Sequence, residues 1–219
     1  MINFDAVSKG YATGFEAIQD VSFSIGAGEL VFLTGHSGAG KSTVLKLIML
    51  MERTTQGNVE VAGRSLSTMG VKDIPALRQQ MGVVFQNHQL LFDRSVFDNI
   101  ALPLRICGYD SVDAARRVRA ALDKVGLLNK EKLNPKMLST GEQQRIGIAR
   151  AIVHKPKILL ADEPTGNLDS QLSAEVMTLF KQFNQVGTTV LIASHDLSLI
   201  RRMNCRTLTL KKGSLVDDV

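Results

Sequence analysis

The chain has 219 residues, of which 44% are hydrophobic and 21% are charged, values typical of a globular protein with a buried core. Its net charge is +5, and this length predicts one domain, or one domain with an inserted lobe. The first residues lack the regions of a signal peptide, and no apolar run approaches the roughly 20 residues that span a bilayer, so we expect a soluble protein. Cys107 and Cys205 have no paired spacing, which favours a reducing, cytoplasmic compartment.

The first third of the sequence predicts β-strands followed by a phosphate-binding loop. Hydrophobic residues alternate with mostly polar neighbours near residues 2–6 and 21–25, as they do in half-buried strands. The apolar segment 30–34 predicts a buried strand, and a helix is expected from residue 41 to about 51. Between them, residues 35–42 (GHSGAGKS) fit the pattern G-x-x-x-x-G-K-[ST].

This strand–loop–helix context is the one in which the pattern binds nucleotide phosphates. Glycines allow a tight turn whose N–H groups point toward phosphate oxygens, and the start of the helix adds partial positive charge. Lys41 supplies a charge for the β- and γ-phosphates, and the Ser42 hydroxyl can ligate Mg²⁺. An ordinary glycine-rich turn is the alternative. The residues expected to bind the nucleotide are Gly35, His36, Ser37, Gly38, Ala39, Gly40, Lys41, Ser42 and Thr43.

The middle of the chain changes from mixed structure to helices. The elements expected first are a strand near 58–61, a helix over 73–80 and a strand over 81–85 that ends at Gln86. From about residue 87 to residue 153 the strand patterns stop, and helices are expected after Ser95, over 110–125 and over 141–153. We therefore expect one domain with an α/β core, about residues 1–86 and 154–219, and an inserted helical lobe, about residues 87–153.

The core pattern returns in the last third of the chain. The expected elements are strands over 157–161 and 188–193, a helix over 171–183, and a short helix before a last strand over 206–210. Strands that alternate with helices predict a mostly parallel sheet with its site at the carboxyl ends of the strands. Asp162 and Glu163 follow the first of these strands, and His195 follows the second.

The pair Asp162-Glu163 has the residue types that nucleotide hydrolysis needs. Asp162 is expected to hold Mg²⁺ through a water, and Glu163 to accept a proton from the attacking water. Alternatively, both carboxylates only cap the turn at Pro164. Adjacent carboxylates at a buried strand end repel each other unless a cation is present, which favours the metal.

The segment 138–145 (LSTGEQQR) carries another pattern. Ser139 and Glu142 fit the S-x-x-E capping box, so a helix is expected to begin here. Together with the phosphate-binding loop, the segment resembles the signature motif of the ATP-binding-cassette (ABC) family, which usually reads LSGGQ. Thr140 and Glu142 depart from that motif, whereas Ser139 and Gly141, which the family uses against the γ-phosphate, are retained. We hypothesise that the β-branched Thr140 restricts a backbone built for glycine.

The resemblance covers nearly the whole chain and implies an ATPase that uses ATP and Mg²⁺. The implied fold is an α/β P-loop NTPase with a mostly parallel, RecA-like core sheet, an N-terminal antiparallel β subdomain and an inserted α-helical lobe. The implied roles are adenine stacking for Tyr11, Mg²⁺ binding and partner sensing for Gln86, a dimer contact for Asp169 in the loop 166–169, and γ-phosphate contact for His195. Glu163 and His195 are then catalytic, and the implied metal ligands are Ser42, Gln86 and Asp162.

In this family the signature of one subunit closes over the phosphate-binding loop of another. The resemblance therefore implies a homodimer with ATP between its subunits. The residues that would act on the other subunit's ATP are Ser139, Thr140, Gly141 and Glu142.

The segments 35–42, 85–94, 141–145 and 164–169 resemble the cell-division branch of the family. Its members pair with an FtsX-like integral membrane protein at the cytoplasmic face of the bacterial inner membrane, at the septum. The resemblance implies control of peptidoglycan hydrolysis together with other division proteins. The alternative is the ATPase of a lipoprotein-release or macrolide exporter, and the discriminating segment is 91–99 (LFDRSVFDN), whose surface is expected to receive the membrane partner.

Other classes of P-loop protein fit the sequence less well. A GTPase would carry N-K-x-D, but the nearest stretch, 129–132, ends in Lys132. DNA-repair ABC ATPases need long coiled coils, for which 219 residues leave no room, so no nucleic acid is expected. Glu163 and His195 argue against a scaffold that only binds nucleotide. Two clusters of basic residues lie on predicted helices, and each is either a solvated helix face or a surface that faces anionic lipid. They are Arg116, Arg117 and Arg119, and Arg201 and Arg202.

Overall fold

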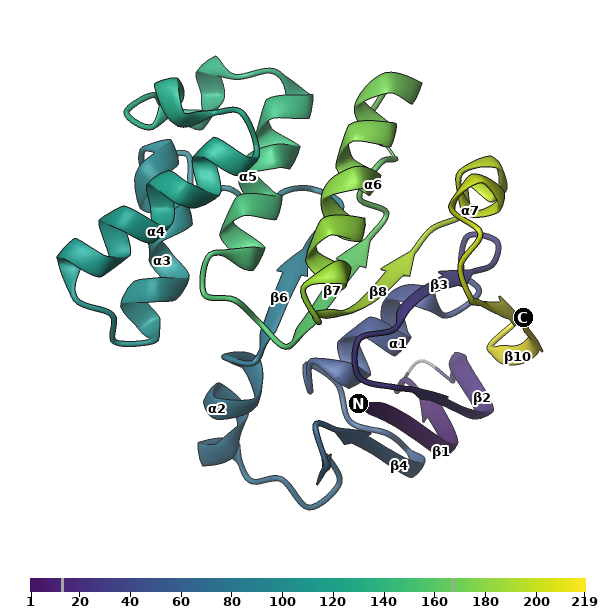
Figure 1. Ribbon diagram of the computed structural model, residues 1–219. Helices are drawn as coiled ribbons and strands as arrows, with labels where there is room; N and C mark the ends of the chain where they lie inside the picture. Colours follow the sequence, from purple (N-terminus) through teal and green to yellow (C-terminus); the bar gives the residue numbers. More distant parts are fainter. Residues whose placement is uncertain (13, 167) are drawn as a thin grey trace.

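The computed structural model describes residues 1–12, 14–166 and 168–219 (Figure 1). Its strands are β1 (Ile2–Gly10), β2 (Glu16–Ile25), β3 (Leu30–Thr34), β4 (Gln56–Val61), β5 (Arg64–Ser65), β6 (Met81–Val84), β7 (Ile158–Asp162), β8 (Thr189–Ala193), β9 (Thr207–Lys211) and β10 (Ser214–Asp218). Its α-helices are α1 (Lys41–Ile48), α2 (Ile74–Arg78), α3 (Val96–Ile106), α4 (Ser111–Lys124), α5 (Thr140–Ile152), α6 (Ser170–Gln185) and α7 (Leu197–Met203). Short 3₁₀ turns are η1 (Val71–Asp73), η2 (Leu128–Lys130) and η3 (Pro135–Met137). Within these described residues, no helix combines the length and the apolar character that crossing a membrane requires.

The first strands form an antiparallel sheet in the order β2-β1-β4-β5. Buried and exposed residues alternate along much of β2, which confirms the predicted half-buried strands. On the buried face, the Phe4 ring stacks on the Phe23 ring with centroids 4.5 Å apart. This face shares one hydrophobic core with α1, so the antiparallel sheet is fixed close to the start of that helix.

The second sheet has the order β10-β9-β3-β8-β7-β6, and its inner pairs are parallel. The antiparallel sheet and α1 share a core with one face of this sheet, whereas α5, α6 and α7 pack on the other (Figure 1). Because both faces are covered, β3, β7 and β8 are almost continuously hydrophobic and buried. The predicted α/β fold with a mostly parallel sheet is therefore confirmed.

Three local predictions needed correction. The expected last strand, 206–210, is followed by β10, which pairs antiparallel with β9 after a turn at Gly213 (φ 85°). The first helix ends at Ile48 and not near 51, because Leu50 adopts a left-handed backbone with φ 49°. The helical spacing of apolar residues over 110–125 also predicts that Val112 lies on the buried face, but Val112 is 79% exposed and Ala114 is buried instead.

Helices α3, α4 and α5 lie between β6 and β7 in the sequence and pack on one another (Figure 1). They enclose a hydrophobic cluster distinct from the two clusters that flank the parallel sheet, with Ile100, Val118 and Ile146 fully buried in it. We propose on this basis the division suggested by the sequence, a core of about residues 1–86 and 154–219 with a helical lobe of about residues 87–153.

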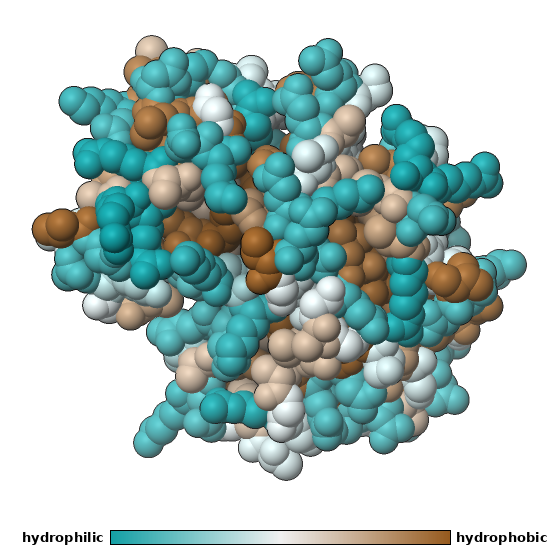
Figure 2. All heavy atoms as spheres, in the orientation of Figure 1, coloured by the Kyte–Doolittle hydropathy of each residue, from teal (hydrophilic) through white to brown (hydrophobic). Residues whose placement is uncertain are grey.

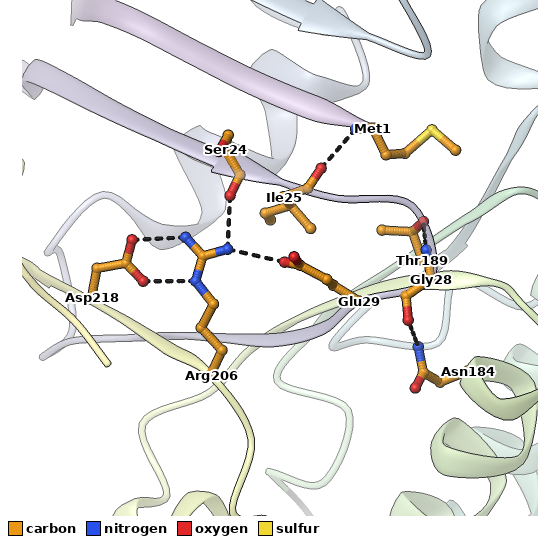
Figure 3. Close-up of polar contacts among 9 residues, drawn as sticks. All are labelled: Met1, Ser24, Ile25, Gly28, Glu29, Asn184, Thr189, Arg206 and Asp218. Carbon is orange, nitrogen blue, oxygen red and sulfur yellow. Dashed lines mark hydrogen bonds and ion pairs between the residues drawn. The ribbon is translucent and has the colours of Figure 1, made fainter.

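A polar junction holds the β2–β3 connection against the end of the chain (Figure 3). The Arg206 guanidinium donates two hydrogen bonds of 2.7 Å to Asp218, one of 2.9 Å to Glu29 and one of 2.8 Å to the carbonyl of Ser24. The Met1 ammonium donates to the carbonyl of Ile25 at 2.7 Å. These contacts fix the antiparallel sheet relative to the β9–β10 edge of the parallel sheet.

Candidate nucleotide-binding site

One cavity of about 840 Å³ collects residues from six segments of the chain, four of which contain the carboxyl ends of β3, β6, β7 and β8 or the residues that follow them. They meet because parallel strands end at the same edge of the sheet. The cavity is lined by Gly35, His36, Ser37, Gly38, Ala39, Gly40, Lys41, Ser42, Thr43, Gln86, Asp162, Glu163 and His195, among others. The structure thus brings these predicted residues together, while their individual roles stay predictions.

Two glycines allow the loop before α1 to take its shape. Gly35 has φ 147° and Gly40 has φ 109°, and both values lie in the region that favours glycine. A Cβ atom on Gly35 would lie 2.4 Å from the carbonyl oxygen of Leu210, and one on Gly40 would lie 2.6 Å from that of Ala17. Any side chain at either position would push the loop away from β9 or β2.

The start of α1 differs from the other long helix starts. Side chains accept hydrogen bonds from the first N–H groups of α3, α4, α5, α6 and α7. At α1 the capping position is Gly40, which offers no side chain, and no acidic residue lies in the first turn. The free N–H groups and the helix dipole therefore favour an anion, as the phosphate-binding pattern predicts.

Lys41 lies inside the loop, with only 8% of its side chain exposed. Its ammonium donates to the carbonyl oxygens of Gly35 at 2.7 Å and His36 at 3.3 Å. The same atom lies 3.7 Å from a carboxylate oxygen of Glu163. A cation in this position is directed at the space between the loop and β7, where phosphate charge is expected.

Burial dominates the electrostatics of Asp162. Burial raises its pKa, and the charge of Glu163 raises it further, whereas a hydrogen bond from Ser42 and the charges of Lys41 and Lys46 lower it. The Ser42 hydroxyl, the Gln86 amide and the Asp162 carboxylate line one cavity, and oxygen donors of this kind suit Mg²⁺. Since the described residues contain no cluster of three His, Cys, Asp or Glu that could hold a metal, Mg²⁺ would need phosphate oxygens and waters to complete its coordination.

Glu163 and His195 contact each other at the ends of β7 and β8. The Nδ1 atom of His195 lies 2.8 Å from the Glu163 carboxylate, and its backbone N–H donates to the same carboxylate at 3.4 Å. Glu163 has a left-handed backbone with φ 48°, a costly conformation that its N–H stabilises by donating to the carbonyl of Ala193 at 2.9 Å. Glu163 is 11% exposed and His195 is 66% exposed, so the histidine can reach a ligand without moving the carboxylate.

The signature residues are not part of this cavity's lining. They begin α5 with the predicted capping box, in which Ser139 and Glu142 exchange side-chain-to-backbone hydrogen bonds. The Glu142 carboxylate also pairs with Lys130. Lys130 therefore offsets the negative charge with which Glu142 departs from the family motif. Thr140 has no left-handed backbone, so the structure gives no support to the hypothesis that threonine restricts this loop.

Two further predicted residues also stand outside the cavity lining. Asp169 caps α6 by accepting from the N–H groups of Gln171 and Leu172, each at 2.9 Å. In the same predicted loop, Asn167 lies outside the described residues. The ring of Tyr11 lies 4.9 Å from the Lys9 ammonium, and the aromatic side chain that lines the cavity is Phe15. The adenine-stacking role of Tyr11 and the dimer role of Asp169 stay predictions.

Arg150 is a connecting residue that sequence reasoning missed. It lies on α5 and donates to the carbonyl oxygens of His88 at 2.6 Å and Gln89 at 2.7 Å. His88 and Gln89 both have left-handed backbones, with φ 53° and φ 47°, and they follow Gln86 closely. Arg150 thus ties the helix that begins with the signature to the segment that carries Gln86, and no sequence pattern indicates this long-range contact.

Comparison with known proteins decides the family. A sequence model described as "ABC transporter" matches residues 18–166. This chain belongs to the ABC transporter family. It is 55% identical over 215 residues to the protein of Escherichia coli K12 named "Cell division ATP-binding protein FtsE", covering 98% of this chain and 97% of the relative. It is 42% identical over 218 residues to a protein of the same name from Streptococcus pneumoniae D39, covering 100% of this chain and 95% of the relative.

Solved structures agree with this assignment. A dimeric bacterial ABC transporter cassette, MJ0796, is 33% identical and superposes with a TM-score of 0.92, covering 100% of this chain and 98% of that one. A dimer of MJ0796 in a post-hydrolysis state, bound to ADP and Pi, is 32% identical with the same TM-score of 0.92, covering 100% of this chain and 98% of that one. The chain is therefore an ABC-type ATPase that binds ATP and ADP, and its relatives favour the cell-division reading over the exporter alternative.

Proposed function

We propose that the chain is the ATP-hydrolysing subunit of an FtsE–FtsX-type complex in bacterial cell division. It would act at the cytoplasmic face of the inner membrane, at the septum, with an FtsX-like integral membrane protein and other division components. The observation that carries the proposal is identity over nearly the full chain with relatives named as cell division ATP-binding proteins, combined with a cavity that contains Lys41, Asp162, Glu163 and His195. ATP-driven closure and reopening of a dimer would pass through the membrane partner to control peptidoglycan hydrolysis.

The geometry supports a specific division of labour at the nucleotide. The loop before α1 and Lys41 bind the phosphates. Ser42, Gln86 and Asp162 would hold Mg²⁺, which when bound would neutralise phosphate charge. Glu163 accepts the proton of the attacking water. His195, hydrogen-bonded to Glu163, orients that carboxylate and contacts the γ-phosphate. The Lys41 ammonium next to Glu163 partly balances the charge of this carboxylate before the proton arrives.

A second copy of the chain would complete the site. The signature at the start of α5 does not line the cavity of its own chain, and the similar cassette MJ0796 is dimeric. We infer a head-to-tail homodimer in which Ser139, Thr140, Gly141 and Glu142 face the other subunit's ATP. Each bound ATP then contributes to holding the two subunits together.

A groove of about 500 Å³ supports the proposed docking of the membrane partner. It lies between α2, β6, α3 and α5. Gln89 is part of its lining, whereas none of residues 91–99, the segment expected to receive the partner, lines it. Its lining includes Phe85, Leu102 and Ile106, and the Ile106 side chain is 64% exposed. An exposed apolar side chain in a groove is the type of feature that binds a partner's helix.

Glu163→Gln tests the catalytic assignment. Glutamine keeps the size of the side chain but cannot take a proton, so we expect hydrolysis to fall by about 10²–10⁴-fold while the ATP-bound dimer accumulates. Phosphate release measures turnover, and size-exclusion chromatography with ATP measures the dimer. Hydrolysis at the wild-type rate would show that Glu163 is not the base.

Co-purification from membranes tests the partner and the groove. Glu163→Gln, held in the ATP-bound form, should recover an FtsX-like protein that mass spectrometry identifies. Adding Ile106→Asp should abolish this recovery, whereas Val112→Asp, which changes another exposed apolar residue, on α4, should not. Recovery of a lipoprotein-release subunit would contradict the cell-division proposal and favour the exporter alternative.

A further inference from the structure

The basic side chains that are left to bind a ligand in and next to the helical lobe are not the arginines that the sequence suggested. Arg116 and Arg117 pair with Asp113, and Arg119 pairs with Glu131, so that cluster is largely neutralised. Farther along the chain, the exposed residues Lys124, Lys155 and Lys157 make no ion pair with any residue of the described ranges. Their charge is available to a ligand.

These lysines surround a cavity of about 610 Å³ between the end of α4, the α5–β7 connection and the end of α6. Its floor is apolar, with Val153 and Phe183 buried, and Val186 on its lining is 79% exposed. The Lys124 ammonium lies 5.9 Å from the centroid of the Phe183 ring. In Figure 2, hydrophobic surface between α5 and α6 is surrounded by hydrophilic side chains. We call this site the lysine-rimmed cavity, defined by Lys124, Lys155, Lys157, Phe183 and Val186.

The backbone that carries two of the lysines is fixed in place. Lys155 has a left-handed backbone with φ 55°, and its N–H donates to the carbonyl of Ile152 at 2.8 Å. The carbonyl of Lys157 accepts from the N–H of Thr189 at 3.0 Å. The backbone positions of Lys155 and Lys157 are therefore set by α5 and β8 before any ligand arrives, so binding needs to order only their side chains.

The shape and the type of charge indicate what fits. A flat membrane surface contacts convex basic faces, whereas a concave cavity with an apolar floor accepts a protruding side chain. Arg117 is held by Asp113, so the available cations are lysines, which act as separate point charges and lack the fork of arginine that matches phosphate. Separate positive charges around an apolar floor complement carboxylates spaced along one side of an amphipathic helix.

We propose that the lysine-rimmed cavity docks an acidic amphipathic helical segment of a protein partner. Apolar side chains one turn apart on the partner helix contact Phe183 and Val186, and its flanking carboxylates pair with the three lysines. The site lies on elements that do not line the nucleotide cavity, so docking here is compatible with bound ATP.

Fluorescence anisotropy with the full chain tests this proposal. The probe is a labelled peptide of about 14 residues with leucine at i, i+3, i+4 and i+7 and glutamate elsewhere. A scrambled peptide of the same composition, without an apolar face, is the control. We expect saturable binding of the amphipathic peptide that is at least about tenfold tighter than that of the scrambled one and weakens with salt.

Matched variants test whether the amphipathic peptide binds at the lysine-rimmed cavity. Lys124→Glu/Lys155→Glu/Lys157→Glu and, separately, Val186→Asp should each weaken the amphipathic peptide by about tenfold or more. The triple variant Lys72→Glu/Lys132→Glu/Lys181→Glu makes the same change of net charge at exposed lysines elsewhere and should bind like wild type. ATPase rates and thermal unfolding show that each variant is folded.

Three results would overturn the proposal. They are no peptide binding by the wild-type chain, equal affinity for the scrambled peptide, and equal loss in the two triple variants. Vesicles of phosphatidylcholine and phosphatidylglycerol provide the remaining comparison. If the wild-type chain binds these vesicles through Lys124, Lys155 and Lys157 but does not bind the peptide, the cavity is a lipid site and the proposal is wrong.

Discussion

The starts of α1 and α5 are both predicted to face the phosphates of ATP, yet they are built in opposite ways. At α1, Gly40 offers no capping side chain, and the Lys41 ammonium donates to carbonyl oxygens of its own loop and lies 3.7 Å from the Glu163 carboxylate. At α5, Ser139 and Glu142 form a reciprocal capping box, and Lys130 pairs with the Glu142 carboxylate. The N–H groups at the start of α1 are therefore left for a ligand, whereas side chains already accept hydrogen bonds from N–H groups at the start of α5. The difference predicts that one chain can bind nucleotide phosphates at the start of α1 before the start of α5 from a second chain contributes.

Among the variants that test this comparison, Lys41→Ala should have the largest effect, which is on ATP affinity. Hydrogen bonds from a charged group contribute about 1.5–3 kcal/mol, so we expect ATP affinity to fall by roughly 10- to 150-fold. Titration with a fluorescent ATP analogue measures it, and Ser139→Ala in the same titration should bind like wild type. Unchanged affinity in Lys41→Ala would refute the role assigned to this lysine.

Ser139→Ala should change the start of α5 while leaving the start of α1 intact. Loss of the cap should lower the free energy of unfolding by about 1 kcal/mol, because an N–H at the start of α5 loses its acceptor. Turnover should fall while binding of ATP to the monomer is unaffected. Ser95→Ala is the matched control, since Ser95 caps α3 in the same way by accepting from the N–H of Asp98. Equal loss of turnover in both variants would show that the effect is only structural.

Glu142 should make the start of α5 sensitive to acid. Lys130, and then the Ser139 N–H, hold the pKa of Glu142 below its ordinary value. A lowered folded-state pKa stabilises the fold above the unfolded pKa, and this contribution is lost as the pH falls through the folded one. The unfolding free energy of wild type should therefore exceed that of Glu142→Gln by about 1 kcal/mol or less near neutral pH, and the difference should shrink as the pH falls through the lowered pKa of Glu142. A difference that stays constant across the titration would mean that the carboxylate charge contributes nothing.

Thr140→Gly should have the smallest effect. Thr140 is the first residue of α5, exposed and without a left-handed backbone, so glycine there removes no strain. We expect the unfolding free energy to change by less than about 0.5 kcal/mol and dimer formation and turnover to stay at wild-type values. A several-fold gain in either would show that threonine does restrict the cross-subunit site.

The sequence predicted best what depends on local physics. The loop 35–42 and the capping box at Ser139 and Glu142 are short patterns whose chemistry acts within a few residues. The strand ends that carry Asp162 and His195 followed from hydrophobic runs, and parallel pairing then placed them at one edge of the sheet.

What the sequence missed depends on contacts between distant segments. β10 is polar and exposed, so its pairing with β9 leaves no hydrophobic alternation. Lys130 and Arg150 find their partners only in the folded chain, and Phe15 lines the cavity because of the way the β1–β2 connection folds. Val112 lies on the expected helix, but which face is buried is decided by the neighbours of α4.

The two bonds from Arg150 to His88 and Gln89 have a mechanical consequence. Each left-handed residue stores of order 1–3 kcal/mol of backbone strain, and a single side chain on α5 holds both carbonyls. One side chain on α5 therefore restrains two strained residues of the segment after Gln86, so replacing Arg150 would remove both restraints together.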